Sequence, residues 1–299
     1  MTPRTAALEY AGARQRVSDY IALTKPGLVA MVLVTTAVGF YLGSASAVDG
    51  ARMLATILAT GLAAGGTLAL NQYIERDLDA RMDRTRSRPL PDGRLQPIEA
   101  LVFGAGLTAA GLLYLTLAID PLSGLVTAAT VVSYLFLYTP LKLKTPLCTL
   151  VGAIPGALPP LTGWAAARGD LSTEAWVLFA ILFLWQLPHS LAIAWLYRDD
   201  YARADMRLLP VVEPDGRSTG RQIAANCLAL LAVGMLPTIL GLTGRMYFVA
   251  ATLLGSALLV FGVQLAAQRT PAAARRLLFA TLIYLPVLLV AMALDKVAL

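Results

Sequence analysis

Residues 71–94 read NQYIERDLDARMDRTRSRPLPDGR, and this stretch decides how the rest of the chain is interpreted. It holds five acidic residues and six arginines, and it continues directly from the apolar run 53–70. If this stretch is helical, its polar residues at four-residue spacing lie along one stripe that turns slowly around the helix: Asn71, Glu75, Asp79 and Asp83. Asp77 would point the other way. Carboxylates at the mouth of a membrane helix are costly unless a cation holds them, so the stripe predicts a cation site.

The chemistry of the stripe favours a particular cation. Oxygen ligands of this kind suit Mg²⁺, which typically takes one or two carboxylates and completes its shell with substrate phosphates. The arginines that follow are natural partners for a phosphate group. We therefore expect a magnesium-diphosphate site at the membrane surface. The alternative is a charged cytoplasmic loop with a solvated helix end, but a loop selected only for charge does not need the four-residue acidic spacing.

Composition places the chain among polytopic membrane proteins. It has 299 residues, of which 58% are hydrophobic and 14% charged, with a mean hydropathy of +0.68. We predict an all-α fold, a single domain over residues 1–299 with nine transmembrane helices bundled around a central cavity. The nine apolar segments lie near 22–44, 53–74, 98–119, 121–139, 149–167, 175–197, 222–243, 246–267 and 276–295.

The basic residues follow a topological pattern, so the net charge of +6 does not indicate nucleic acid. With a cytoplasmic N-terminus, that side carries 20 of the 24 basic residues, and the opposite side carries Arg52, Arg168, Arg245 and Lys296. This positive-inside signal puts the C-terminus on the outer side. Residues 1–17 show no convincing presequence, which favours a bacterial inner membrane. Cys148 and Cys227 are predicted to be buried thiols, since the sequence contains no disulfide framework.

Three further segments carry chemistry. Lys25-Pro26 opens the first span, where Lys25 is either an interfacial lysine or a phosphate contact. Lys142 and Lys144 stand in a proline-bracketed turn, and the Gly- and Pro-rich span that follows predicts a bent helix. The last segment runs from His189, the only histidine, to a second acidic-basic cluster around Arg198, Asp199 and Asp200. A lone histidine in a core is more often hydrogen-bonded structure than a ligand.

The two charged clusters end the second and sixth predicted spans, one four-helix unit apart. This spacing suggests two pseudo-repeated four-helix halves, about 20–140 and 147–267, plus a ninth helix. If the halves pack face to face, both clusters rim one cavity and their carboxylates bind the metal ions of one diphosphate.

These residues resemble the UbiA superfamily of intramembrane prenyltransferases, over roughly residues 18–295. The similarity is most specific in DYIALTKPG, in the 71–95 stretch, in YTPLKLKTPL with GALPPLTGWAA, and in the PH…YRDDY…LPVV segment. The first aspartate-rich motif of the superfamily maps onto Asn71, Glu75 and Asp79. In the second motif, Tyr197 stands where an aspartate is usual and Asp205 where glycine is usual, a departure that fits the haem-farnesylating branch better than the quinone branch.

The resemblance implies electrophilic alkylation: farnesyl transfer from farnesyl diphosphate to a vinyl group of haem B, with water addition, giving haem O. It implies Mg²⁺ on Asn71, Glu75, Asp79 and Asp200. It also implies haem or diphosphate contacts from a larger set, in which Arg76 and Lys142 assist the departing oxygens and His189 serves the haem: Lys25, Arg76, Arg84, Arg88, Lys142, Lys144, His189, Tyr197 and Arg198. Expected partners are the lipid bilayer and haem A synthase.

Two other functions compete with this one. The first is prenyl transfer to an aromatic acid for quinone synthesis, against which His189 and Tyr197 argue. The second is a transporter that uses the acidic stripe as a cation path. Such a path usually requires acidic groups within the spans, and the middle of each predicted span contains none.

Overall fold

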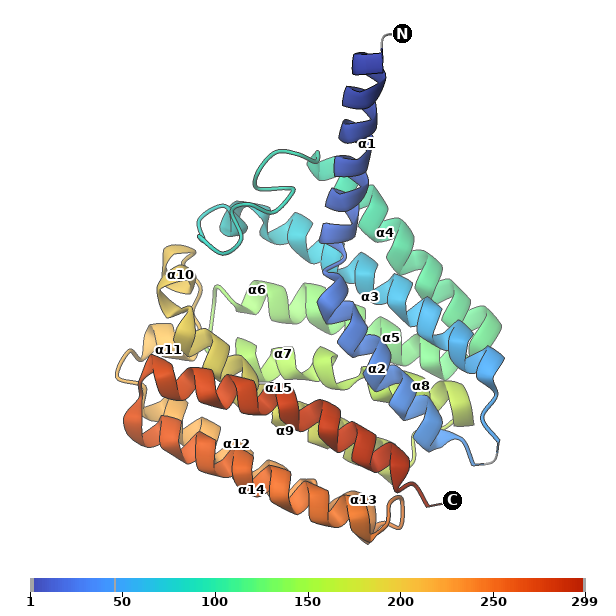
Figure 1. Cartoon of the computed structure of the whole chain (residues 1–299), viewed down its shortest axis with the longest axis vertical. Helices are drawn as coiled ribbons and strands as arrows, with labels where there is room; N and C mark the ends of the chain where they lie inside the picture. Colours follow the sequence, from blue (N-terminus) through green and yellow to red (C-terminus); the bar gives the residue numbers. More distant parts are fainter. Residues whose placement is uncertain (1–2, 46, 298–299) are drawn as a thin grey trace.

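A computed structural model describes residues 3–45 and 47–297, and these residues form a helical bundle (Figure 1). The first half contains α1 (Pro3–Leu23), α2 (Pro26–Gly43), α3 (Gly50–Asp79), α4 (Pro97–Tyr114), the π-helix η1 (Leu115–Ile119), α5 (Pro121–Val132), the π-helix η2 (Ser133–Tyr138) and α6 (Thr139–Leu141). The second half contains α7 (Cys148–Ala157), α8 (Pro159–Arg168), α9 (Thr173–Leu196), α10 (Arg198–Arg203), α11 (Leu209–Val212), α12 (Arg217–Val233), α13 (Leu236–Ile239), α14 (Arg245–Gln268) and α15 (Pro271–Leu294).

The predicted membrane spans are confirmed as helices. Within the described residues, eight continuous helical runs are long and apolar enough to cross a membrane. The fifth predicted segment, 149–167, is instead divided between α7 and α8, each of ten residues. The predicted bend therefore occurs at Leu158, where Pro159 and Pro160 follow and remove two backbone donors. Helix α1, which hydropathy does not indicate, is an addition to the predicted set.

Helix α8 packs directly against the backbone of α2, because both helices present glycine at the contact. A methyl group added at Gly39 would lie 2.0 Å from the carbonyl oxygen of Pro160. One added at Gly163 would lie 1.9 Å from the carbonyl oxygen of Thr36. Close approach of this kind is how membrane helices associate where lipid supplies no hydrophobic driving force.

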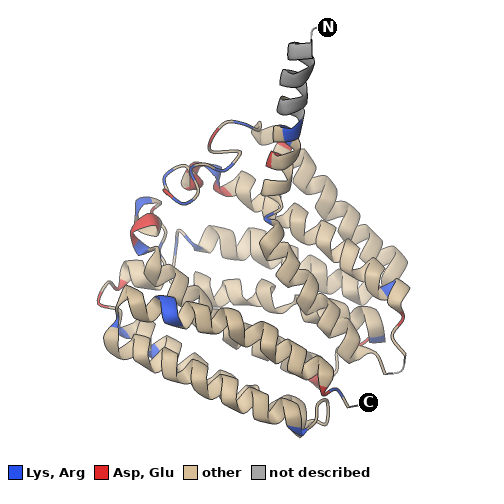
Figure 2. Ribbon diagram, in the orientation of Figure 1, with Lys and Arg blue, Asp and Glu red and all other residues tan. Residues whose placement is uncertain are grey.

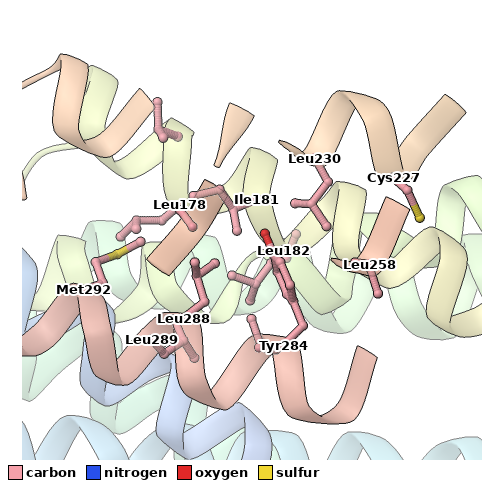
Figure 3. Packing of buried hydrophobic residues seen from close by; sticks show 14 of the residues in the cluster. Leu178, Ile181, Leu182, Cys227, Leu230, Leu258, Tyr284, Leu288, Leu289 and Met292 are labelled. Atoms are coloured by element: carbon pink, nitrogen blue, oxygen red, sulfur yellow. The ribbon is translucent and has the colours of Figure 1, made fainter. Parts of the chain in front are cut away.

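The apolar core lies mainly in the second half of the bundle. Figure 3 shows Tyr284, Leu288 and Met292 of α15 beside Leu178 and Ile181 of α9, and all five side chains are buried. Both cysteines are free and buried, as predicted. Many large apolar side chains on the outside of the spans are exposed, which suits contact with lipid.

Charged residues gather at one end of the bundle, on the loops after α3, around α10 and at the start of α15 (Figure 2). Two ion pairs attach α1 to this end. Arg94 donates to the buried Asp19 at 3.0 Å, and Arg16 pairs with Glu99 in the first turn of α4. Glu99 also closes a capping box on the N-terminus of α4, so the predicted start of that span at Pro97 is confirmed.

Candidate active site

The end of α3 buries one polar face. Asn71, Glu75 and Asp79 are 1%, 5% and 1% exposed, whereas the side chain of Asp77 is 80% exposed and points away, as predicted. The predicted stripe is wrong at its last position. Helix α3 ends at Asp79, so Asp83 lies in the following turn, where its exposed carboxylate pairs with Arg203 at 2.7 Å.

Each of the two buried carboxylates on α3 has its own cation. The first, Glu75, accepts a hydrogen bond from Lys142 Nζ at 2.6 Å, and that ammonium also lies 4.4 Å from the centre of the Tyr138 ring. Burial favours the neutral amine, but the Glu75 carboxylate outweighs it and raises the pKa of Lys142 above its ordinary value. Lys142 therefore stays protonated beside Glu75.

The second carboxylate, Asp79, pairs with an arginine that the loop brings back. Arg88 Nη1 donates to Asp79 Oδ2 at 2.7 Å. The loop is held in place by Thr85, whose hydroxyl donates to the backbone carbonyl of Asp79 at 2.8 Å. A loop with prolines at 89 and 91 thus returns a guanidinium to the helix from which it left.

Lys25 and Asn71 form the third contact of the buried cluster. Lys25 Nζ donates to Asn71 Oδ1 at 3.2 Å, and the Asn71 amide donates to Thr139 Oγ1 at 3.2 Å. Burial, together with the charges of Arg88 and Lys142, lowers the pKa of Lys25 to about 7. Lys25, Arg88 and Lys142 therefore share one small region with the two α3 carboxylates.

The second acidic-basic cluster lies against the first. The buried carboxylate of Asp200, on α10, accepts from the backbone N–H of Asp83 at 3.3 Å, and it also pairs with Arg203. Arg84 donates to the Tyr201 hydroxyl at 3.1 Å, with its guanidinium 5.2 Å from the centre of the Tyr197 ring. The two clusters, far apart in sequence, thus contact each other through the loop after α3, and the single cavity rimmed by both stays a prediction.

Asp205 occupies a backbone position that suits a smaller residue. Its φ is +57°, in the left-handed region that glycine adopts without cost. The Asp205 carboxylate, which is exposed, pairs with Arg81 at 2.9 Å. Asp205 therefore links the two clusters at the protein surface, through Arg81, and is not part of the buried polar group.

Several predicted residues lie outside the buried cluster. The guanidinium of Arg76 bonds to the Tyr73 carbonyl at 2.8 Å and lies near Asp77. Lys144 is exposed, and Arg198 lies over the Trp195 ring at 5.1 Å, beside Asp199. His189 is in α9, where its Nδ1 contacts Thr281 Oγ1 at 2.8 Å and its ring stacks on Trp185 at 4.9 Å.

An open groove of about 370 Å³ connects the outside of the bundle with Glu75. Its walls come from α3 and from the η2–α6 segment and are mostly apolar: Ile74, Leu78, Leu135, Phe136, Pro140 and Leu143. Ile74 and Phe136 are exposed on the outside of the bundle. The groove thus joins an apolar exterior to a buried charged group.

The donors suit Mg²⁺ in chemistry and in number. Within the described ranges, no three Asp, Glu, His or Cys side chains lie close enough to form a metal site by themselves. Magnesium usually needs only one or two carboxylates and takes its remaining ligands from phosphate and water. Asn71, Glu75 and Asp79 offer one amide oxygen and two carboxylates on one helix face, and Asp200 offers a third carboxylate in the adjoining cluster.

Comparison with known proteins defines the class. Residues 32–284 match the UbiA prenyltransferase family, and the chain belongs to this family. It is a membrane-embedded enzyme of the prenyltransferase class. Among its relatives, the protoheme IX farnesyltransferase of Solibacter usitatus is 50% identical over 287 residues, covering 93% of this chain and 98% of that protein. The protoheme IX farnesyltransferase of Koribacter versatilis is 43% identical, covering 95% of each chain.

Solved structures share the fold at low sequence identity. A structure of digeranylgeranylglyceryl phosphate synthase has a TM-score of 0.80 at 17% identity, covering 95% of this chain and 100% of that one. A UbiA homologue from Archaeoglobus fulgidus, bound to GPP and Mg²⁺, has a TM-score of 0.63 at 16% identity, covering 92% and 99%. The predicted fold class is confirmed.

Sequence reasoning missed three residues that hold the buried cluster. Tyr138 lies under the Lys142 ammonium, Thr139 contacts Asn71, and Gln72 donates to the carbonyl of Leu23 at 2.8 Å. Gln72 thereby ties the end of α1 to α3, next to Lys25. Gln72 directly follows Asn71, and Tyr138 and Thr139 precede Lys142 by four and three residues, so proximity in sequence was the available signal.

Proposed function

We propose that this chain transfers a farnesyl group from farnesyl diphosphate to a vinyl group of haem B, with water addition, giving haem O and diphosphate. The observation that carries the proposal is that two buried carboxylates, Glu75 and Asp79, pair with the partly buried cations Lys142 and Arg88 at the charged end of the bundle. Relatives named protoheme IX farnesyltransferase, up to 50% identical over almost the whole chain, support the choice of substrates.

The cationic side chains act on the diphosphate. Lys25, Arg88 and Lys142 would turn from their present partners to the phosphate oxygens, since charge-assisted bonds to phosphate are as strong as those to carboxylate. Mg²⁺, held by Asn71, Glu75, Asp79 and Asp200, would neutralise the diphosphate and make it a better leaving group. The magnesium- and GPP-bound homologue of this fold supports that assignment.

The chemical step balances without an oxidant or reductant. The C1–O bond of farnesyl diphosphate breaks, and its electron pair leaves with the diphosphate. The π electrons of the haem vinyl group form the new bond to C1 of the allylic cation. Water then adds to the cation that remains on the vinyl carbon and loses a proton, which leaves a hydroxyethylfarnesyl side chain. The cationic side chains stabilise the charge that develops on the leaving oxygens.

The haem and the prenyl chain have separate candidate positions. Because Nδ1 of His189 is engaged by Thr281, Nε2 is the nitrogen we assign to the haem iron. Arg84, Lys144, Tyr197 and Arg198 at the surface are assigned to the propionates. The apolar groove beside Glu75 offers the prenyl chain a path from the bilayer to the diphosphate.

We place the enzyme in a bacterial inner membrane with its charged end in the cytoplasm and its C-terminus outside, in agreement with the distribution of basic residues. Haem A synthase, which would consume the product, is the proposed neighbour in the membrane.

The test is product analysis. Purified enzyme with haem B, farnesyl diphosphate and Mg²⁺ should give the mass of haem O, and omission of any one of these should remove it. A parallel incubation with an aromatic acid and a longer prenyl diphosphate tests the quinone-type reaction. Prenylated aromatic acid without haem O would overturn the proposal.

A further inference from the structure

Thr139 belongs to the buried polar cluster and contacts one of its members, Asn71, through the side-chain hydroxyl. It is the first residue of α6, it is buried, and it stands between Tyr138 and Lys142, which pack on each other. Its hydroxyl oxygen has two neighbours, the backbone carbonyl of Tyr134 at 2.9 Å and the side-chain amide of Asn71 at 3.2 Å.

The hydroxyl proton of Thr139 is committed to the backbone. A carbonyl oxygen only accepts, so the bond to Tyr134 uses the single proton that threonine has to donate. The π-helix η2 makes this carbonyl available, because the backbone N–H of Thr139 also bonds to Tyr134, five residues back. Toward Asn71, therefore, Thr139 offers a lone pair alone.

This commitment fixes which way the amide of Asn71 faces. The two ends of an asparagine amide have nearly the same shape, and surrounding hydrogen bonds decide which end is oxygen. An acceptor at Thr139 requires the NH₂ group there, which turns Oδ1 to the other side. On that side Lys25 Nζ donates at 3.2 Å, an independent contact that the same orientation satisfies.

From this network we infer that Thr139 is a positioning residue, which orients the amide of Asn71 so that its oxygen faces the diphosphate and metal site. The inference rests on the proposed function of Asn71, Glu75 and Asp79. With the amide reversed, Thr139 would have to give up its bond to Tyr134, and a nitrogen donor would face the ammonium of Lys25 and the metal position. Both changes leave buried polar groups without suitable partners.

The test measures binding of inorganic pyrophosphate to purified enzyme by calorimetry, with and without Mg²⁺. Thr139→Val keeps the shape of the side chain and removes its acceptor, and we expect magnesium-dependent affinity to fall about tenfold. Thr139→Ser restores the hydroxyl and should return affinity to within about twofold. Thr130→Val is the matched control, because the Thr130 hydroxyl bonds only within its own helix, to Val126, and its loss should leave binding unchanged.

A double-mutant cycle separates orientation from a general structural effect. In Asn71→Asp both side-chain ends are oxygen, so no orientation remains to be fixed, and Thr139→Val should then change affinity by less than about twofold. An equal loss in both backgrounds, a Thr139→Val enzyme that binds like wild type, or failure of Thr139→Ser to restore binding would overturn the inference. If Thr139→Val does not fold, Thr139→Ala is carried through the same cycle with the same criteria.

These outcomes are distinct from a failure of the proposed function. Wild-type enzyme that binds pyrophosphate with Mg²⁺ but makes no haem O would overturn the choice of acceptor and leave the positioning role testable. Wild-type enzyme that binds no pyrophosphate would overturn both.

Discussion

The two ends of the membrane helices use cationic side chains in opposite ways. At the charged end, Lys142 and Arg88 pair with the side-chain carboxylates of Glu75 and Asp79. At the other end, Arg52 and Lys296 donate to backbone carbonyls where helices finish. Arg52 contacts Ala166 and Ile119 at 2.8 Å each, and Lys296 contacts Tyr41 and Ser44 at 2.6 Å each.

This difference in partners distinguishes cations that can take part in substrate binding from cations that only hold helices together. The last carbonyls of a helix lack intrahelical partners, and a cation that satisfies them gains nothing by leaving. A cation held by a carboxylate can exchange that partner for a phosphate, and the carboxylate released is then free for a metal ion. The charged end is therefore built for exchange of partners, and the opposite end is built to stay closed.

The strongest challenge to this contrast is removal of both carboxylates on α3. Glu75→Gln combined with Asp79→Asn should reduce haem O formation by at least about 100-fold, since each loss leaves a buried cation unpaired and removes a metal ligand. Product is measured by mass spectrometry on membrane-inserted protein. Asp77→Asn, on the exposed face of the same helix, should stay within about twofold of wild type. Turnover of the double variant within tenfold of wild type contradicts the metal assignment.

Removal of Lys142 tests how much its ion pair with the buried Glu75 contributes to stability. Lys142→Met should lower Tm by roughly 5–10 °C, because it leaves Glu75 buried without a counter-ion. Addition of Glu75→Gln to Lys142→Met should recover part of this loss. Lys144→Met, two residues away and exposed, should change Tm by less than about 2 °C. Equal changes in Tm for the two lysine variants would show that the Glu75–Lys142 ion pair does not contribute specifically to stability.

His189 lies between the two ends and tests whether the haem site is separate from the diphosphate site. His189→Ala should lower haem-dependent turnover about tenfold, the range found for loss of an orienting or ligating side chain, with farnesyl diphosphate affinity within about twofold. Thr281→Val, which frees Nδ1, should show a smaller change in the same direction. Parallel losses in both measurements would count against a haem role for His189.

The smallest expected effect on stability comes from Arg52, at the end of the bundle opposite the charged end. Arg52→Met should lower Tm by roughly 2–4 °C through loss of its bonds to helix carbonyls, and it should leave the KM for farnesyl diphosphate unchanged. Arg245→Met, an exposed arginine at the same end, is the matched control and should leave both quantities unchanged. A raised KM in Arg52→Met would break the distinction between the two ends.

Hydropathy and spacing predicted most of the fold. The segments predicted near 98–119 and 246–267 match Pro97–Ile119 and Arg245–Gln268 within a residue or two, because lipid contact requires a continuous apolar run. Helix α1 escaped prediction because it carries charges along its length and is held by ion pairs to Arg94 and Glu99. The division into halves at 20–140 and 147–267 stays a prediction.

The shared face of the polar residues on α3 was predictable from sequence, but their partners were not. Spacing placed Asn71, Glu75 and Asp79 on one face, but nothing local assigns Lys142 to Glu75, which is 67 residues away. The separate surroundings of Lys142 and Lys144 also depend on the turn that follows α6, which leaves the side chain of Lys142 only 11% exposed and places Lys144 at the surface. The stripe failed at Asp83 because α3 ends four residues earlier, where the chain turns back toward Asp79.

The glycine contact between α2 and α8 limits how this enzyme can open. With Gly39 and Gly163 set against opposing carbonyl groups, the two helices cannot slide or roll past one another without a steric clash. Any widening of the bundle that admits a bulky molecule from the bilayer is therefore expected between other helices, such as those that line the groove beside Glu75. The α2–α8 contact thus keeps the bundle together, and the entry of substrate depends on other helix–helix contacts.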